Sequence, residues 1–270
     1  MTKAFLDTTI IVNILLKRNE LHDRCRAALQ RFDSASFPAY ALKEMKAGPL
    51  HAWIWLHNRC VTDRSYERVV RAIHAMARTR QKNLADSALE AVAETGASKR
   101  MKMGSLVEKY GASATEDVVH CDRMRLGLQR RITQAWRQPF ALEADISNPL
   151  PCFEIGEFTI KRGLIEFARL SCDWKRGCEI AAQMSREPEK VVALRKVTES
   201  DPSRRESNKR SQSLRHIVRT PNRPMNDNQC RAIGDAVFAF FTPADSVILT
   251  TNIKDHRPLA AALGKRAEEP

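Results

Sequence analysis

The sequence has no apolar run that approaches the ~20 residues needed for a transmembrane helix. Its apolar stretch nearest the N-terminus, residues 10–16, is interrupted by Asn13 and preceded by Asp7. A secretory signal peptide has basic residues before such a stretch and a small-residue cleavage site after it. We therefore expect a cytoplasmic protein with no membrane partner.

Closely spaced cysteine pairs are also absent. The seven cysteines are odd in number and scattered, and none forms a Cys-x-x-Cys motif. Zinc sites usually take their ligands in such pairs, and disulfide frameworks need an even set in a secreted chain. We therefore expect neither a zinc finger nor a disulfide scaffold. The sequence contains no internal repeat.

Acidic residues are outnumbered, with 32 Asp and Glu against 45 Lys and Arg, which gives a net charge of +13. Such an excess favours a polyanionic partner, most often nucleic acid. It is concentrated in residues 201–224, where seven basic residues accompany two acidic ones. Because its first part is rich in Ser and poor in apolar residues, we interpret this stretch as a flexible basic loop. Its predicted nucleic-acid-binding residues are Arg204, Arg205, Lys209, Arg210 and Arg215.

The last fifty residues contain a helix-strand pattern followed by polar side chains. Residues 246–249 are short, β-branched and bounded by turn residues, which indicates a strand buried on both faces. Thr251 and Asn252 come directly after this strand, and Asp255 follows three residues later. Open α/β sheets place their chemistry at such carboxyl ends. We interpret His256 as a surface residue, with a local base as the alternative.

Three more acids stand at comparable places in the chain. A short strand ends at Asp7, and a helix follows with Thr8 or Thr9 as its N-cap. Glu44 lies on a helix after a second strand or extended segment, and Asp235 opens the helix before residues 246–249. Asp227 competes with Asp235 for this role, or caps a helix.

These segments resemble the PIN-domain (PilT N-terminus-like) nucleases over residues 1–60 and 225–265. The resemblance implies an α/β fold with a central, mostly parallel sheet flanked by helices. Residues 1–95 and 225–270 would form the core, and residues 96–224 a large, mostly helical insertion with the basic loop 201–224. Within the insertion, residues 153–160 alternate around a glycine-first turn and predict a small hairpin.

The resemblance also implies the site residues. The catalytic set is Asp7, Glu44, Asp235 and Asp255, of which Asp7, Glu44 and Asp235 are the metal ligands, and the supporting residues are Thr8, Thr251 and Asn252. The fourth acidic position is open between Asn252 and Asp255. Hard oxygen ligands favour Mg²⁺ or Mn²⁺. Crowded carboxylates repel each other, so the change Asp7→Asn is expected to stabilise the metal-free protein.

The function implied is metal-dependent endonucleolytic hydrolysis of RNA, as a toxin-type or defence nuclease. RNA is the expected partner, with single-stranded DNA as the alternative. A small antitoxin or regulatory protein and a homodimer are further expectations. Three other functions are considered: a DNA-directed nuclease, a catalytically inactive nucleic-acid-binding module, and a phosphohydrolase using an aspartyl-phosphate. The last needs a second Asp where Thr9 stands.

Overall fold

The computed structural model of the chain describes residues 2–17, 19–79, 81–96, 111, 115–137, 144–147, 158–167, 178–200, 205–220 and 223–270. Its centre is a five-stranded sheet with the strand order β3-β2-β1-β6-β7. Every pair of neighbouring strands in this sheet is parallel. The strands are β1 (Lys3–Leu6), β2 (Ser34–Pro38), β3 (Ala144–Ser147), β6 (Ser246–Leu249) and β7 (Arg266–Glu268). The α/β class and the parallel sheet expected from the sequence are thus confirmed.

The two central strands are apolar because helices cover both faces of the sheet. Phe5 and Leu6 of β1 and Ile248 and Leu249 of β6 are fully buried. β1 and β6 pair with Leu6 opposite Leu249, so both strands end at the same edge. A strand buried on both faces is expected to read as a continuous apolar run, which is why both are visible in the sequence.

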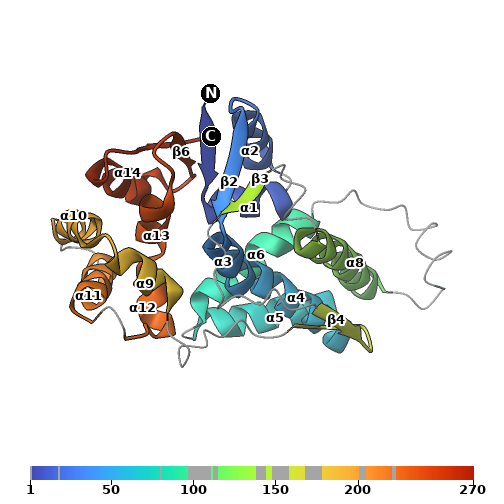
Figure 1. The fold of residues 1–270 in the computed structure, drawn as a ribbon. Helices are drawn as coiled ribbons and strands as arrows, with labels where there is room; N and C mark the ends of the chain where they lie inside the picture. Colours follow the sequence, from blue (N-terminus) through green and yellow to red (C-terminus); the bar gives the residue numbers. More distant parts are fainter. Residues whose placement is uncertain are drawn as a thin grey trace.

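Helices that connect the strands lie around the sheet (Figure 1). They are α1 (Thr8–Leu15), α2 (Glu20–Leu29), α3 (Ala39–Ala47), α13 (Gly234–Phe241) and α14 (Ile253–Ala262). α1 packs on α2 and α3, and α13 packs on α14. Asn19 caps α2 by accepting a hydrogen bond from the His22 amide, 3.1 Å away. Asp7 occupies the N-cap position of α1 but makes no capping hydrogen bond, which leaves its carboxylate for other contacts.

A second group of helices packs below the sheet in Figure 1. It comprises α4 (Pro49–Asp63), α5 (Tyr66–Ala77), α6 (Lys82–Gly96) and α8 (Glu116–Arg137). α4 contacts the other three. A hairpin of β4 (Phe158–Lys161) and β5 (Leu164–Phe167) is fastened to α4 by Asn58, whose amide bonds both backbone groups of Ile165 at 2.8 and 2.9 Å.

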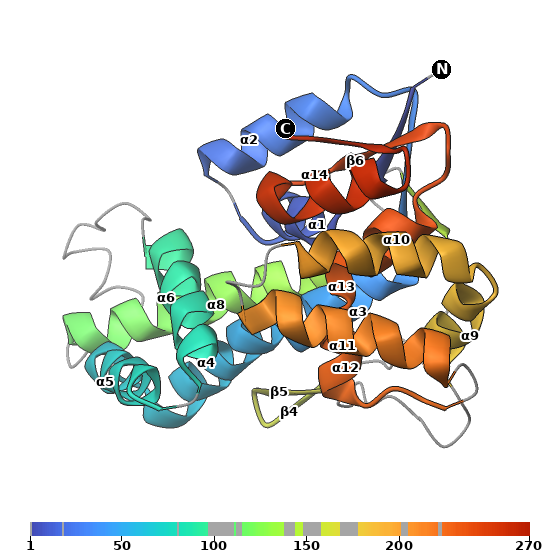
Figure 2. The same ribbon diagram turned by 90° about the vertical axis from the view of Figure 1, so that its left-hand side faces the viewer.

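A third group consists of α9 (Glu179–Ser185), α10 (Pro188–Glu199), α11 (Arg205–Arg219) and α12 (Asp227–Ala232). α10 packs on α11, α13 and α14 (Figure 2). The expectation of a flexible loop in this region is wrong for residues 205–219, which form a helix. Ser207, Ser211 and Leu214 are buried and lie at helical spacing. Small serine side chains thus form part of a packed face, which an apolar pattern does not show.

One further expectation about residues 96–224 is corrected. β3 lies within this range, yet it pairs with β2 as an edge strand of the central sheet, so the range is not purely an insertion. Residues 158–160 of the expected hairpin belong to β4, whose hairpin with β5 turns at Arg162 and Gly163, both with positive φ. The expected partner strand, residues 153–155, lies outside the described residues. Across the described ranges, no helix is long and apolar enough to cross a membrane.

Candidate functional site at the carboxyl edge of the sheet

Asp7 lies at the centre of the site, immediately after β1 and beside the end of β6. Its backbone amide donates to the Leu249 carbonyl at 3.0 Å, so the strand pairing continues to this residue. The Asp7 carboxylate is buried, and its Oδ2 accepts hydrogen bonds of 2.7 Å from the hydroxyls of both Thr9 and Thr250. Asp7 is therefore held by contacts from two separate segments and is not a simple helix cap.

The structure changes the set of supporting threonines. Thr9 and Thr250 contact Asp7, whereas Thr251 takes part through its backbone amide, which donates to Thr9 Oγ1 at 3.1 Å. Thr8 instead donates to Glu44 Oε2 at 2.6 Å. The sequence indicated a run of hydroxyls, but alternate residues of a helix start point in different directions, and only the fold shows which hydroxyl meets which acid.

Glu44 approaches the site from α3. Burial raises the pKa of Glu44 to about 7, the nearby carboxylates of Asp7 and Asp235 add to the rise, and the Thr8 hydrogen bond opposes it. Gly234, the first residue of α13, lies so close that an added Cβ would be 2.5 Å from Glu44 Oε1. A larger residue here would force the buried Glu44 carboxyl to move, so the glycine lets Glu44 keep its position beside the start of α13.

Asp235 completes the acidic cluster from the first turn of α13. Its Oδ2 forms an ion pair with the Arg210 guanidinium, and Arg210 Nε also donates to the Ala232 carbonyl at 3.3 Å. Burial raises the pKa of Asp235; the positive charges of Arg210 and His256 oppose this, and the Asp7 and Asp255 carboxylates reinforce it. Arg210 therefore acts as a local counter-ion for this acid.

His256 is the main functional residue that the sequence interpretation missed. It is fully buried, and its Nε2 lies 3.6 Å from Asp7 Oδ1 and 3.5 Å from Asp235 Oδ1. Burial would lower the pKa of His256, but the close carboxylates of Asp7 and Asp235 raise it overall. In turn, burial alone would raise the pKa of Asp7, and contact with His256 holds it below its usual range. The expectation of a surface histidine is wrong.

A signal for this burial was available. His256 stands three and four residues before Leu259 and Ala260, which are both buried in α14. These three positions share one helix face. The same ring also packs edge-on against Phe238, with centroids 5.7 Å apart.

The two candidates for the fourth acidic position touch each other. The side-chain Nδ2 of Asn252 donates to Asp255 Oδ2 at 2.9 Å, and the backbone amide of Asn252 donates to Thr250 Oγ1 at 2.9 Å. Asp255 is close enough to Asp235 to raise the pKa of that residue. Both candidates thus border the cluster. Asp227 does not, because it is exposed in the first turn of α12 behind its N-cap, Asn226.

The predicted nucleic-acid-binding residues separate into three groups. Arg210 is part of the acidic site. Lys209 and Arg215 are exposed on α11, and Arg215 pairs with Glu199 at 3.1 Å. Arg204 lies outside the described residues, as does the side chain of Arg205. Arg210 pairs with Asp235 in the structure, and its binding to nucleic acid stays a prediction.

The donor chemistry fits a divalent cation, although no finished metal centre is formed. Asp7 Oδ1 and Asp235 Oδ1 face the same ring nitrogen of His256, so two hard oxygen donors are directed at one region. Within the described ranges, no group of three or more His, Cys, Asp or Glu side chains is arranged to hold a metal ion. A third oxygen would have to come from Glu44, which is directed to Thr8 here.

A comparison of this chain with protein-family models, with curated proteins and with solved structures yields no match. Any functional conclusion therefore depends on the fold and on the chemistry of this site.

Proposed function

We propose that the chain is a metal-dependent endoribonuclease of the PIN-like type. The observation that carries the proposal is the meeting of Asp7, Glu44 and Asp235. These three acids come from segments far apart in the sequence, and the pKa shifts show that they interact electrically. Burial and mutual repulsion raise the pKa of Glu44 and of Asp235, and carboxyl groups perturbed in this way are typical of functional sites.

Asp7 and Asp235 would hold the cation through Oδ1, with Glu44 as the third oxygen donor. A bound Mg²⁺ or Mn²⁺ supplies positive charge for the scissile phosphate and lowers the pKa of water. Glu44 also suits proton transfer, because a carboxyl with a pKa of about 7 can accept a proton near neutral pH. Arg210, beside Asp235, provides a guanidinium that can pair with a phosphate oxygen.

The supporting residues position these groups. The hydroxyls of Thr9 and Thr250 fix one oxygen of Asp7 and leave the other facing His256. Asn252 orients Asp255 at the border of the cluster. RNA as substrate follows from the resemblance, and the basic charge of the chain is consistent with it. A small antitoxin, a regulatory partner and a homodimer stay predictions.

One observation favours a second function, a nucleic-acid-binding module that does not cleave. His256 and Arg210 already neutralise Asp7 and Asp235, so the cluster can persist without a cation. In that case both residues would be permanent counter-ions, and added metal would change neither stability nor nucleic-acid cleavage.

The test is to incubate the purified chain with end-labelled single-stranded RNA and DNA in Mg²⁺, Mn²⁺ or EDTA. We expect internal cleavage of RNA that requires the metal and is lost in Asp7→Asn. The matched control is Asp227→Asn, which changes an exposed acid away from the site and should cleave normally. Binding without cleavage under all metal conditions would favour the non-cleaving module.

A further inference from the structure

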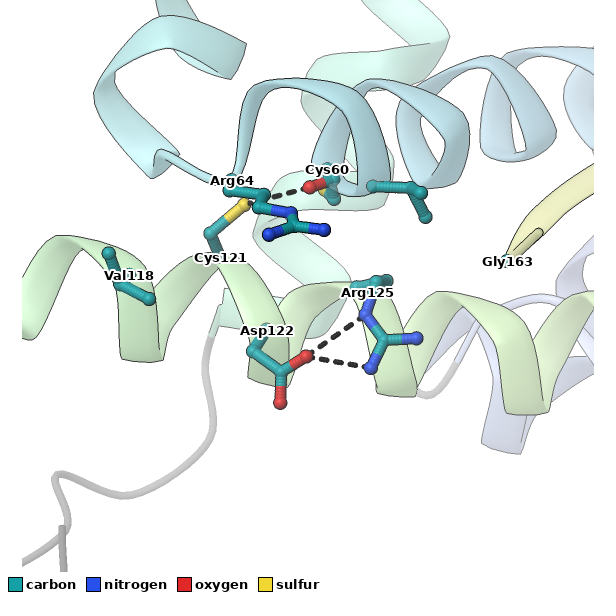
Figure 3. A pocket seen from close by; sticks show the side chains of 8 residues that line it. Cys60, Arg64, Val118, Cys121, Asp122, Arg125 and Gly163 are labelled. Atoms are coloured by element: carbon teal, nitrogen blue, oxygen red, sulfur yellow. Dashed lines mark hydrogen bonds and ion pairs between the residues drawn. The ribbon is translucent and has the colours of Figure 1, made fainter. Parts of the chain in front are cut away.

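A pair of thiols lies between two helices of the second helical group. Cys60 is on the last turns of α4 and Cys121 is near the start of α8. Both side chains point into the space between these helices (Figure 3). They are two of the five cysteines in the described ranges, and both line the same cavity.

The two residues are in direct contact. Cys121 Sγ donates to the Cys60 carbonyl at 3.6 Å, and the two thiols are close enough to shift each other's ionisation. This mutual contact is the largest cause that raises the pKa of Cys60 and lowers that of Cys121. The contact therefore favours ionisation of Cys121 over that of Cys60.

The cavity gives the pair a route to small molecules. It has a volume of about 450 Å³, and its lining residues are Cys60, Val61, Arg64, Val118, Cys121, Asp122, Arg125 and Gly163. Arg125 lies within reach of Cys60 electrostatically and is held by Asp122 through hydrogen bonds of 2.7 and 2.9 Å. A positive charge favours a thiolate, so Arg125 favours ionisation of Cys60, whereas the carboxylates of Asp117, Asp122 and Asp63 oppose that of Cys121.

We propose that Cys121 and Cys60 form an oxidation site for hydrogen peroxide, with Cys121 as the attacking thiol and Cys60 as the resolving thiol. The proposal is independent of the nuclease function. The Cys121 thiolate attacks one peroxide oxygen, the O–O bond breaks, and hydroxide leaves and takes up the thiol proton as water. Cys121 is then a sulfenic acid.

The second step forms the disulfide bond between Cys60 and Cys121. The Cys60 sulfur attacks the Cys121 sulfur, the S–O bond breaks, and a second water leaves with the proton of Cys60. In total, two thiols are oxidised to one disulfide and one peroxide is reduced to two waters. The product would join α4 covalently to α8, which pack together along the second helical group.

The experiment treats the folded full chain with hydrogen peroxide, removes the oxidant, blocks free thiols under denaturing conditions and maps the cysteines by mass spectrometry. We expect a peptide linked through Cys60 and Cys121, while Cys25, Cys178 and Cys230 stay alkylated. A chain in which Cys60 and Cys121 stay alkylated, or are oxidised no faster than Cys25, Cys178 and Cys230, would overturn the proposal.

Single substitutions test the order of the two thiols. In Cys60→Ser, Cys121 should stop at the sulfenic acid, which a dimedone probe labels. In Cys121→Ser, Cys60 should remain reduced at the same peroxide dose. Dimedone labelling of Cys60 in Cys121→Ser, with none of Cys121 in Cys60→Ser, would contradict the assigned roles. Cys25→Ser is the matched control, since this buried thiol lies outside the cavity, and it should still form the linked peptide.

Discussion

The guanidinium of Arg210 on α11 forms an ion pair with Asp235 on α13. The sequence predicted different roles for these two residues. One was expected to grip nucleic acid and the other to bind a metal ion. Their pairing links α11 to the acidic cluster, so the state of the site and the position of this helix depend on each other.

Removing this pair should destabilise the metal-free protein. In Arg210→Ala, Asp235, whose side chain is only 25% exposed in the parent chain, would lose its partner. Leaving a partly buried charge unpaired costs on the order of 1–3 kcal/mol. Urea unfolding in EDTA measures this change. Arg215→Ala is the control, because it removes an exposed pair with Glu199 and should have little effect. Equal losses in both variants would argue against a special role for Arg210.

A side chain at position 234 should displace the Glu44 carboxyl from its place in the site. Gly234→Ala would place a Cβ 2.5 Å from Glu44 Oε1, so we expect a loss of about 1–3 kcal/mol and of cleavage. Gly127→Ala is the matched control within α8, because its Cβ would meet Thr95 Cγ2 at an ordinary 3.6 Å. It should be neutral or stabilising by up to about 1 kcal/mol, from helix propensity. Chemical unfolding and RNA cleavage of both variants check this prediction, and a fully stable, active Gly234→Ala would refute it.

The metal-free protein should lose stability as pH rises towards neutrality. The folded pKa of Glu44 is about 7, against an ordinary value of 4.5. Its protonated form is favoured by the fold, so the associated stability is present below pH 4.5 and is lost as pH rises through about 7. The size is at most about 3 kcal/mol. The pKa of His256 is also raised, from an ordinary value of 6.5, so its protonated form is favoured by the fold. The protein therefore loses further stability as pH rises above 6.5.

Urea unfolding in EDTA from pH 5 to pH 8 measures this slope. Glu44→Gln should flatten the part below pH 7 and leave the part due to His256. A slope in Glu44→Gln that equals that of the parent chain would show that Glu44 does not titrate in this range.

The structure also reverses the expected effect of Asp7→Asn on stability. Carboxylate repulsion alone predicted a gain. However, contact with His256 and the hydroxyls of Thr9 and Thr250 lowers the pKa of Asp7 despite its burial, so the fold favours the charged form. We now expect Asp7→Asn to lower the melting temperature of the metal-free protein at neutral pH. Calorimetry decides between a fall and a rise.

Sequence reasoning located the acids but not their counter-ions. The apolar runs of β1 and β6 are local signals, and an acid after a strand in a parallel sheet must lie at the carboxyl edge. This argument places Asp7 at that edge, whereas the meeting of Glu44 and Asp235 with it was predicted from the resemblance. The contacts of His256 with Asp7 and of Arg210 with Asp235 depend on how α14 and α11 pack, and no spacing encodes that.

The helix α11 is a second feature that could not be predicted from the local sequence. Its charge and serine content are typical of a loop, but its conformation is set by tertiary packing of Ser207, Ser211 and Leu214. Similarly, β3 is only four residues long and becomes a strand because β2 offers a free edge. Such elements are stabilised by partners distant in sequence, so local patterns indicate them poorly.

The most direct test of the central claim is the single-turnover rate of RNA cleavage in Mg²⁺ for Asp235→Asn against Asp227→Asn. Both variants neutralise an acid in the first turn of a neighbouring helix, but only Asp235 faces His256 and Arg210. The account predicts no detectable cleavage by Asp235→Asn and a parental rate for Asp227→Asn. A folded Asp235→Asn protein that cleaves RNA at the parental rate would contradict it.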